Sequence, residues 1–328
     1  MRIRSVLAGI ALGLLVAPGL SAAQPPERVR QIGILVPGFA PYSPSPILEL
    51  FRKGMRQLGY VEGQNLSIDW RRAEGRYDRL PGLAAELARL SVDVILATST
   101  PAIQAAKQAT ATTPIVMAFS DDPVGTGLIA SLARPGGNIT GLSFLSSELS
   151  GKRLQLLKEA VPTAKHVGIL SNAANPSATL QVRETEAAAG ALGVELQNWG
   201  VREPAEFDDA FAAMTRAGIG GLVVVDDPMF VDYHRQLVDL AVTARLPAMY
   251  GMREFVDDGG LMSYGPSVAE VLRRAAVLVD KIFRGAKPAE VPVEQPTTFE
   301  LVINLKTART LGLMIPPTLL VEAEEVSE

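Results

Sequence analysis

The stretch Gln31-Ile-Gly-Ile-Leu-Val36 decides the fold, and a similar stretch, His166-Val-Gly-Ile-Leu170, opens the second half of the chain. Each is a short apolar run of the kind found in strands that are buried on both faces of a sheet. The segments that follow, 46–59 and 176–192, have the apolar spacing of helices. The chain therefore predicts two copies of one strand–helix plan.

The segments outward from these two stretches continue the alternation of single strands and single helices. In the first half we expect strands 31–36, 65–70, 92–97, 114–119 and 139–144, and helices 46–59, 77–90, 101–109 and 123–133. Helix 147–160 then leads to strands 166–170, 194–199, 221–225, 247–250 and 261–264, with helices 176–192, 204–217 and 229–244 and one short helix between them. Such alternation predicts parallel, doubly wound sheets. The predicted fold class is α/β, with two doubly wound parallel-sheet lobes joined by a hinge and a cleft between them.

Composition agrees with two lobes and restricts the function. The chain has 328 residues, of which 48% are hydrophobic and 20% charged, enough for two lobes of roughly 120–150 residues each. The absence of cysteine excludes disulfides, thiolate metal sites and cysteine nucleophiles. The net charge is −4 and the sequence has no cluster of lysine and arginine residues, so nucleic acid is not an expected partner.

The first 23 residues have the pattern of a signal peptide. Arg2 and Arg4 precede the apolar run 5–20, and small residues lead up to Ala23. The alternative is a membrane anchor, but the run is shorter than the roughly 20 residues that a span needs, and Pro18 and Gly19 interrupt it. We expect cleavage after about Ala23 and a soluble periplasmic protein. Removing Arg2 and Arg4 from the 31 basic residues leaves 29 against 35 acidic ones, a net charge of −6.

Residue pairs that start helices follow several predicted strands. They are Ser45-Pro46, Thr100-Pro101, Asp122-Pro123, Asn175-Pro176 and Asp227-Pro228. In each pair the first side chain is suited to cap a helix and proline suits the first helical turn. Ligands of parallel α/β sheets bind outside the carboxyl ends of the strands, where free N–H groups at helix starts attract anions. With Ser43, Thr98, Ser99 and Ser120 nearby, this edge predicts a site for a small anionic group.

Two carboxylates are left over at this edge if Asp122 and Asp227 serve as caps. These are Asp121 and Asp226, which we expect to bind an ammonium or guanidinium group, or else to be solvated or paired with a loop N–H. The aromatic residues at the same strand ends are Phe39, Tyr42, Phe230 and Tyr250, which either stack on a flat ligand or pack in the core. The predicted ligand-binding residues are Tyr42, Ser43, Thr98, Ser99, Ser120, Asp121, Asn172, Asp226 and Tyr250.

The sequence contains no motif that predicts an enzyme. His166 and His234 have no second ligand at metal spacing, and neither a Gly-x-Ser-x-Gly elbow nor a phosphate loop is present. Gly125-Thr-Gly127-Leu-Ile-Ala130 matches a dinucleotide fingerprint formally, but it lies several residues after its strand, behind two acids that would repel a pyrophosphate. We therefore expect no catalytic residue, no metal and no cofactor.

Several motifs carry a resemblance to a known family. They are Asp122-Pro-Val-Gly-Thr-Gly-Leu128, Arg134-Pro-Gly-Gly-Asn-Ile-Thr-Gly141 and Asn304-Leu-Lys-Thr-Ala-Arg-Thr-Leu-Gly-Leu313 followed by Ile315-Pro-Pro317, together with Ile32-Gly-Ile-Leu35 and Phe51-Arg-Lys-Gly-Met-Arg-Gln-Leu-Gly-Tyr60. Over essentially the whole mature chain the sequence resembles ABC transporter substrate-binding proteins of the type I periplasmic-binding fold, including the tryptophan-binding members.

The resemblance implies a division of the chain and a mechanism. The first lobe would comprise 30–145 with a returning segment 267–295, and the second lobe 146–266 with the C-terminal segment 296–328. Hinge closure over a small polar solute, such as an amino acid or an aromatic compound, would let each lobe supply half of the contacts.

By analogy with amino-acid binders of this fold, Ser99 and Ser120 of this chain would bind the carboxylate of the ligand. Asp226 and Tyr250 would face its ammonium group or its side chain. The implied partner is an inner-membrane ABC permease, contacted by a monomer. The alternative is a ligand-sensing subunit of a membrane signalling partner.

Overall fold

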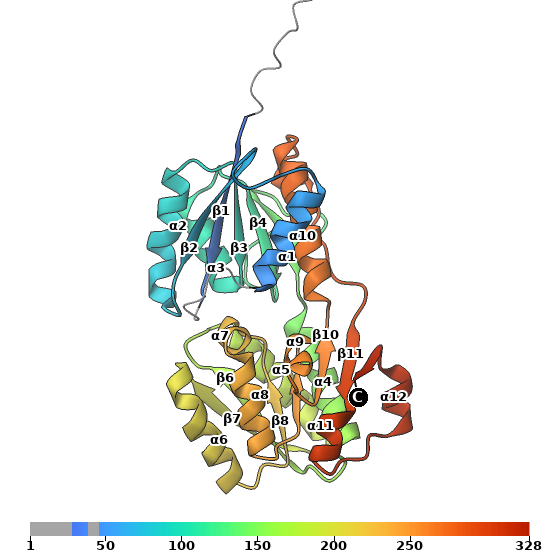
Figure 1. Cartoon of the computed structure of the whole chain (residues 1–328). Coiled ribbons are helices and arrows are strands. Elements are labelled where there is room, and N and C mark those ends of the chain that lie inside the picture. Colours follow the sequence, from blue (N-terminus) through green and yellow to red (C-terminus); the bar gives the residue numbers. More distant parts are fainter. Residues whose placement is uncertain (1–27, 39–45, 328) are drawn as a thin grey trace, which may run out of the picture.

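The computed structural model describes residues 28–38 and 46–327, which form two lobes stacked one above the other (Figure 1). Ser45 of the predicted Ser45-Pro46 helix start therefore lies outside the described residues. The predicted signal peptide, residues 1–23, lies outside them as a whole. Within the described part of the chain, no helix has the length and apolar character needed to cross a membrane.

A five-stranded parallel sheet, in the order β2-β1-β3-β4-β5, forms the first lobe. Its elements are β1 (Arg30–Val36), α1 (Pro46–Gln57), β2 (Leu66–Arg72), a 3-10 turn (Tyr77–Arg79), α2 (Leu80–Arg89), β3 (Val94–Thr98), α3 (Thr100–Ala109), β4 (Ile115–Ser120) and β5 (Ile139–Ser143). β1, β3 and β4 are almost wholly buried, as strands covered on both faces must be.

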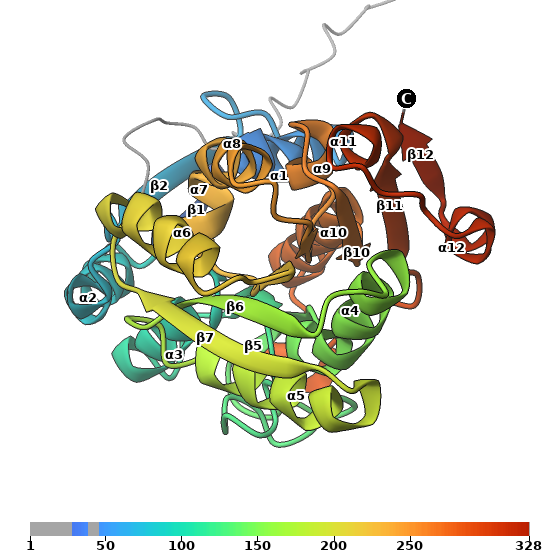
Figure 2. The ribbon, with the colours of Figure 1, turned by 90° about the horizontal axis from the view of Figure 1, so that it is seen from below.

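A seven-stranded sheet forms the second lobe, in the order β12-β11-β10-β9-β8-β6-β7. Its elements begin with α4 (Ser146–Ala160), β6 (His166–Asn172), α5 (Ala178–Leu192), β7 (Glu195–Val201), a 3-10 turn (Pro204–Glu206), α6 (Phe207–Arg216), β8 (Gly221–Val224), α7 (Pro228–Asp232) and α8 (His234–Thr243). They continue with β9 (Ala248–Tyr250), α9 (Glu254–Asp257), β10 (Met262–Gly265), β11 (Glu300–Asn304), α11 (Leu305–Thr310), α12 (Pro317–Glu322) and β12 (Glu325–Ser327). Figure 2 shows α6, α7 and α8 on one face of this sheet and α4 and α5 on the other.

The chain passes between the two sheets more than once. α10 (Val268–Phe283), which follows β10 of the second sheet, packs against α1 of the first lobe. The two helices approach closely because Gly54 has no side chain: a Cβ there would lie 2.9 Å from the Cβ of Ala276. A 3-10 turn (Pro288–Glu290) follows, and Glu294 pairs with Leu142 beside β5 before the chain returns to β11. β11 runs antiparallel to β10.

The prediction of two doubly wound α/β lobes is confirmed, with corrections to single elements. Residues 123–133 form turns instead of a helix, because Gly127 takes a positive φ of 68° and the Asp122 carboxylate accepts a hydrogen bond from the Gly125 amide at 2.8 Å. The helix predicted at 229–244 is divided at Tyr233 into α7 and α8. β11 and β12, which were not predicted, extend the second sheet.

Of three further cap–proline pairs, one is confirmed and two differ in detail. Asp227 caps α7 as expected, accepting from the Met229 amide. Thr100 is instead the first residue of α3, so that Ser99 takes the cap position. Asn175 accepts from the Ser177 amide at 3.0 Å in a local turn, and α5 begins three residues later.

Candidate functional site

A cavity of about 640 Å³ lies between the lobes and is lined by residues of both. Its walls are the carboxyl ends of the strands: Gly38 follows β1, Thr98 ends β3, Asp121 follows β4, and Asp226 and Met252 follow β8 and β9. The predicted edge is therefore the one at which the two sheets face each other. A concave site with apolar walls and a few polar groups is the usual form of a small-molecule site.

Ser99 has the features of a residue held in place for contact with a ligand. It precedes α3, has a φ of 76°, is 7% exposed, and its hydroxyl oxygen has no hydrogen-bond partner among the described residues. A positive φ at a residue other than glycine costs free energy and is concentrated at functional sites. Two more such residues, Phe119 (φ 57°) and Leu145 (φ 61°), lie at the same edge. The edge thus combines strained backbone, a helix start and a free hydroxyl.

Asp121 is nearly buried, with 7% of its surface exposed, and lines the cavity from the first lobe. Its Oδ1 accepts hydrogen bonds from the backbone N–H and the hydroxyl of Ser147, at 2.8 and 3.0 Å, so that it caps α4 from a distance. Its Oδ2 has no partner within the described chain. Burial raises the pKa of Asp121 to about 6 from 3.8. This carboxylate has room for one more donor, and a cation suits it best.

Asp226 also lines the cavity, but its charge is already compensated. Arg153, which is 1% exposed, places its guanidinium 2.9 Å from Oδ2 of Asp226, and the Ser146 hydroxyl donates to the same oxygen at 2.7 Å. Arg153 also donates to the Tyr264 carbonyl at 2.8 Å. Ser146 follows one passage between the lobes and Tyr264 precedes another, so that this ion pair ties the two passages together.

Asn172 and Asp227 form a buried cluster behind the cavity wall. Asp227 accepts from the side-chain amides of Asn172 and Asn175, at 3.0 and 2.7 Å, in addition to capping α7. Burial raises the pKa of Asp227. The Asn172 amide also reaches the hydroxyl of Tyr77 in the first lobe at 3.5 Å. This contact links the two lobes across the cleft.

The second lobe closes the cavity with a charged group around α8 and α9. Asp258 accepts from His234 Nε2 at 2.6 Å and from Arg235 at 3.1 Å, and the Nδ1 of His234 lies 2.6 Å from the Val231 carbonyl oxygen. Next to this group, Glu254 lines the cavity with Oε2 buried and without a partner in the described residues. Burial raises the pKa of Glu254.

Of the predicted site residues, four line the cavity and three lie behind its wall. Thr98, Ser99, Asp121 and Asp226 are on the wall. Ser120, Asn172 and Tyr250 are buried outside the lining, and the Tyr250 ring stacks on Phe255 at 4.5 Å. Tyr42 and Ser43 lie outside the described residues. Of the other two aromatic residues considered, Phe230 is in the core and Phe39 is outside the described residues.

The sequence did not point to Arg153, Glu254 or His234 as parts of the site. Arg153 lies in the middle of α4, whose other charged residues are exposed or half-buried, and nothing in the spacing marks it as buried. Glu254 follows β9, a strand end already predicted to face the cleft, so the position of that strand is the one feature that would have found it. Across residues 28–38 and 46–327, no group of three metal-ligating side chains is present.

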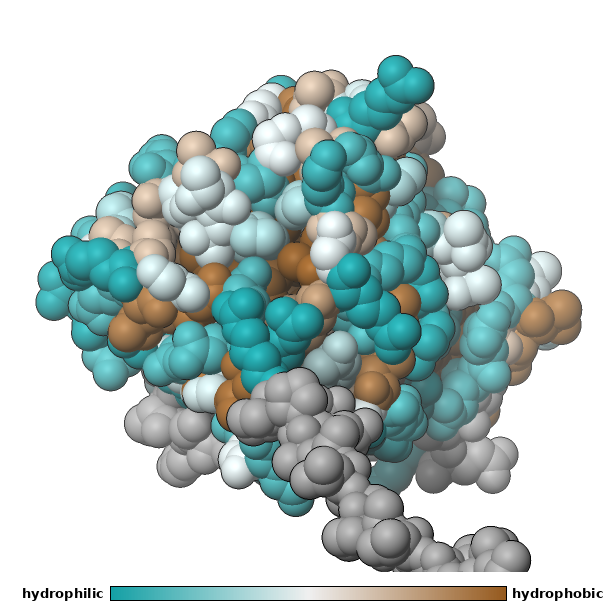
Figure 3. Space-filling view, turned by 90° about the horizontal axis from the view of Figure 1, so that it is seen from above, coloured by the Kyte–Doolittle hydropathy of each residue, from teal (hydrophilic) through white to brown (hydrophobic). Residues whose placement is uncertain are grey.

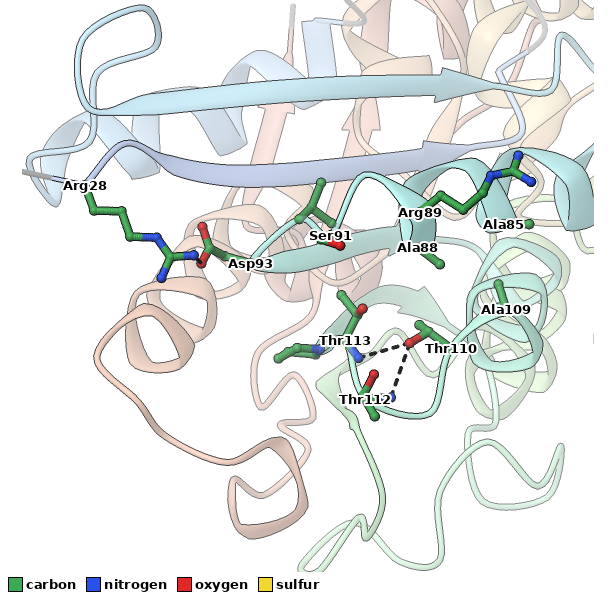
Figure 4. Close-up of a pocket in the computed structure, with 12 residues that line it drawn as sticks. Arg28, Ala85, Ala88, Arg89, Ser91, Asp93, Ala109, Thr110, Thr112 and Thr113 are labelled. Atoms are coloured by element: carbon green, nitrogen blue, oxygen red, sulfur yellow. Dashed lines mark hydrogen bonds and ion pairs between the residues drawn. The ribbon is translucent and has the colours of Figure 1, made fainter.

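A second hollow, of about 680 Å³, lies at the opposite edge of the first sheet (Figure 4). Arg28 and Asp93 form an ion pair at 2.9 Å there, and the Thr110 hydroxyl accepts from the amides of Thr112 and Thr113 at 3.2 and 3.0 Å. Arg28 precedes β1, Asp93 precedes β3 and the threonines precede β4, so the hollow lies at the edge away from the other lobe. The first lobe seen from above is largely hydrophilic with small apolar groups (Figure 3). The cleft is therefore the better candidate.

Comparisons with known proteins agree with a solute-binding cleft. Residues 45–327 match the family model described as ABC transporter substrate binding protein. A curated tyrosine-binding protein of Clostridioides difficile is 29% identical over 264 residues, covering 80% of this chain and 75% of its own length.

Solved structures resemble the chain over nearly its whole length. A protein from Streptococcus pneumoniae in complex with L-Trp has a TM-score of 0.80 and 28% identity, covering 90% of this chain and 99% of that one. A conserved domain protein from Vibrio cholerae has a TM-score of 0.82 and 26% identity, with 92% and 100% covered. A ligand-free, open substrate-binding protein with adhesive properties from Clostridium difficile has a TM-score of 0.62 and 25% identity, with 91% and 99% covered.

Proposed function

Because this chain belongs to the ABC transporter substrate binding protein family, we propose that it captures a free amino acid with an aromatic side chain in the interlobe cleft and delivers it to an ABC importer. The observation that carries the choice of an amino acid is that two residues lining the cavity each have a buried polar atom without a partner among the described residues, Oδ2 of Asp121 and Oγ of Ser99. One suits an ammonium group and the other a carboxylate.

The carboxylate end of the ligand is assigned to the start of α3. Helix N-termini present free N–H groups and a partial positive charge, which stabilise an anion. Ser99 adds its hydroxyl as a donor, and Thr98 lines the cavity next to it. No arginine is required at this position.

The ammonium end is assigned to Asp121 in preference to Asp226. Arg153 already neutralises Asp226, whereas the only donors to Asp121 in the described chain are the amide and hydroxyl of Ser147, both on Oδ1. A ligand ammonium on Oδ2 would satisfy the remaining oxygen and favour its ionised form.

The side chain of the ligand is assigned to the apolar part of the wall. Phe119 and Phe144 of the first lobe and Met252, Phe255 and Val268 lie there. Burial of an aromatic ring against such residues removes a large apolar area from water. The tryptophan and tyrosine bound by the two relatives are consistent with this assignment.

Closure of the lobes would couple capture to transport. The Tyr77–Asn172 contact spans the cleft, and the chain superimposes better on the relative with bound L-Trp than on the open, ligand-free relative at nearly equal identity. A different angle between lobes lowers the score of a whole-chain superposition. A ligand that touches both lobes favours the closed form in proportion to its contacts there.

The proposal includes a division of the chain into two lobes and a periplasmic location. The first lobe takes 30–145 and the returning segment 267–295, and the second takes 146–266 and 296–328, so that the chain passes three times through the hinge. The mature chain, cleaved after about Ala23, works as a periplasmic monomer that contacts its permease transiently, without catalytic chemistry of its own.

A ligand screen tests the proposal. The mature chain is expected to carry an aromatic amino acid through purification, detectable by mass spectrometry under native conditions, and to melt at a higher temperature when tryptophan or tyrosine is added, because a ligand that binds only the folded state stabilises it. If sugars or inorganic anions raise the melting temperature and no amino acid does, the proposed substrate class is wrong.

A further inference from the structure

Among the described carboxylates that line the cavity from the second lobe, Glu254 is the one with a buried oxygen that has no hydrogen-bond partner. It is the first residue of α9, which follows β9 after a short turn, and its Oε2 is buried without a hydrogen bond. A buried polar atom without a partner costs free energy, so its presence on a cavity wall points to a partner that arrives with the ligand.

The charged side chains next to Glu254 form ion pairs with other residues. Asp258 holds His234 and Arg235, at 2.6 and 3.1 Å. Arg253, next to Glu254 in the chain, pairs with Asp257 and Glu325, at 3.4 and 2.9 Å. No cation of the described residues is paired with the Glu254 side chain.

The surroundings of Glu254 determine which ligand group it meets. Phe255, the next residue in the chain, and the nearby Met252 line the same cavity, and Val231 lines it from α7. The ammonium acceptor proposed above, Asp121, belongs to the first lobe. A ligand held at Asp121 and extended along the apolar wall would bring the far end of its side chain to the carboxylate of the second lobe.

We propose that Glu254 selects ligands whose aromatic side chain carries a hydrogen-bond donor, so that the site accepts the indole N–H of tryptophan or the phenol O–H of tyrosine and discriminates against phenylalanine. This inference rests on the proposed function. An N–H or O–H group donates to the carboxylate, whereas a phenyl ring leaves Oε2 buried and unpaired. Sites built around such a hydrogen bond reject analogues that lack it far more strongly than apolar pockets discriminate by size.

Titration calorimetry of the whole mature chain with three ligands tests the inference without any mutation. The probes are L-tryptophan, L-phenylalanine and the tryptophan analogue in which sulfur replaces the indole N–H, a benzothienyl-alanine of nearly the same shape. We expect both ligands without a donor to bind at least about tenfold more weakly than tryptophan, the factor expected for one hydrogen bond to a charged group. Equal affinity of tryptophan and its sulfur analogue would overturn the assignment.

Variants then locate the selectivity. Glu254→Leu is expected to reduce the tryptophan-to-phenylalanine affinity ratio to about one, and Glu254→Gln, which keeps an acceptor oxygen, to retain part of it. Asp239→Asn is the control in the second lobe, because Asp239 is an exposed acidic residue of α8 that does not line the cavity, and it should leave the ratio unchanged. A ratio that survives in Glu254→Leu contradicts the inference.

The two levels of the proposal fail differently. If no aromatic amino acid binds the wild-type chain, the proposed function is wrong. If tryptophan, tyrosine and phenylalanine all bind with the same affinity, the proposed function stands and the role of Glu254 is wrong. Because the ligand series uses only wild-type protein, a folding defect in a variant does not affect the outcome.

Discussion

Replacement of Asp121 by asparagine should change how the stability of the ligand-free chain depends on pH. Burial raises the pKa of this carboxyl to about 6, against its ordinary value of 3.8. Between these two values the folded chain binds a proton that the unfolded chain has released. The contribution of Asp121 to stability therefore falls as the pH rises through this window and stays constant above it.

The magnitude follows from the two values. A difference between 3.8 and about 6 corresponds to a loss of about 3 kcal/mol of unfolding free energy on going from below pH 4 to above pH 6. Asp121→Asn keeps an acceptor for the Ser147 amide but does not titrate, so it should lack this loss. Urea unfolding of both proteins at a series of pH values measures the effect. As the pH rises, the unfolding free energy of Asp121→Asn should increase relative to that of the wild type by up to about 3 kcal/mol.

The same carboxyl should give ligand binding a pH dependence. An ammonium group requires the ionised form, so affinity for an amino acid should fall about tenfold for each unit below about pH 6. A deaminated ligand such as indole propionate should not show this fall. Stability curves of wild type and variant that stay parallel from pH 4 to pH 7 would refute the reasoning about burial of Asp121.

Four further substitutions test the hinge, the packing and the site. Arg153→Met should cost about 3–5 kcal/mol in chemical unfolding, because it leaves the carboxylate of Asp226 buried without its cation; a cost under about 1 kcal/mol would speak against the ion pair. Gly265→Ala should destabilise the chain strongly, since its Cβ would lie 2.0 Å from a backbone oxygen, whereas Gly190→Ala, with no atom within 4 Å, should raise the stability by about 0.5–1 kcal/mol. Ser99→Ala should weaken amino-acid binding about tenfold with unchanged melting temperature, because its hydroxyl has no partner to lose; unchanged affinity would remove it from the carboxylate site.

Sequence reasoning identified the fold because the fold depends on local patterns. The apolar strands β1 and β6 and the helices between strands are visible in the spacing of residues, and parallel strands then place their carboxyl ends at one edge. The helix predicted at 123–133 was wrong because apolar spacing there competes with glycines, and Gly127 adopts a positive φ that a helix excludes.

The cavity wall was predictable only in part. Asp121 and Ser99 follow strands directly, so that their positions follow from the sheet. The partner of Asp226 was not predictable in this way, since Arg153 lies in α4, far from Asp226 in the sequence. Whether a carboxylate at a strand end is compensated depends on residues distant in sequence, and the spacing of residues carries no information about them.

The most direct test of the account is a calorimetric titration of the mature chain with L-tryptophan and L-tyrosine at a pH above the pKa of Asp121. The account predicts saturable binding at one site per chain, with markedly weaker binding of indole propionate, which lacks the ammonium group. Absence of binding by either amino acid, or equal affinity for the deaminated ligand, would contradict capture of an amino acid between Ser99 and Asp121.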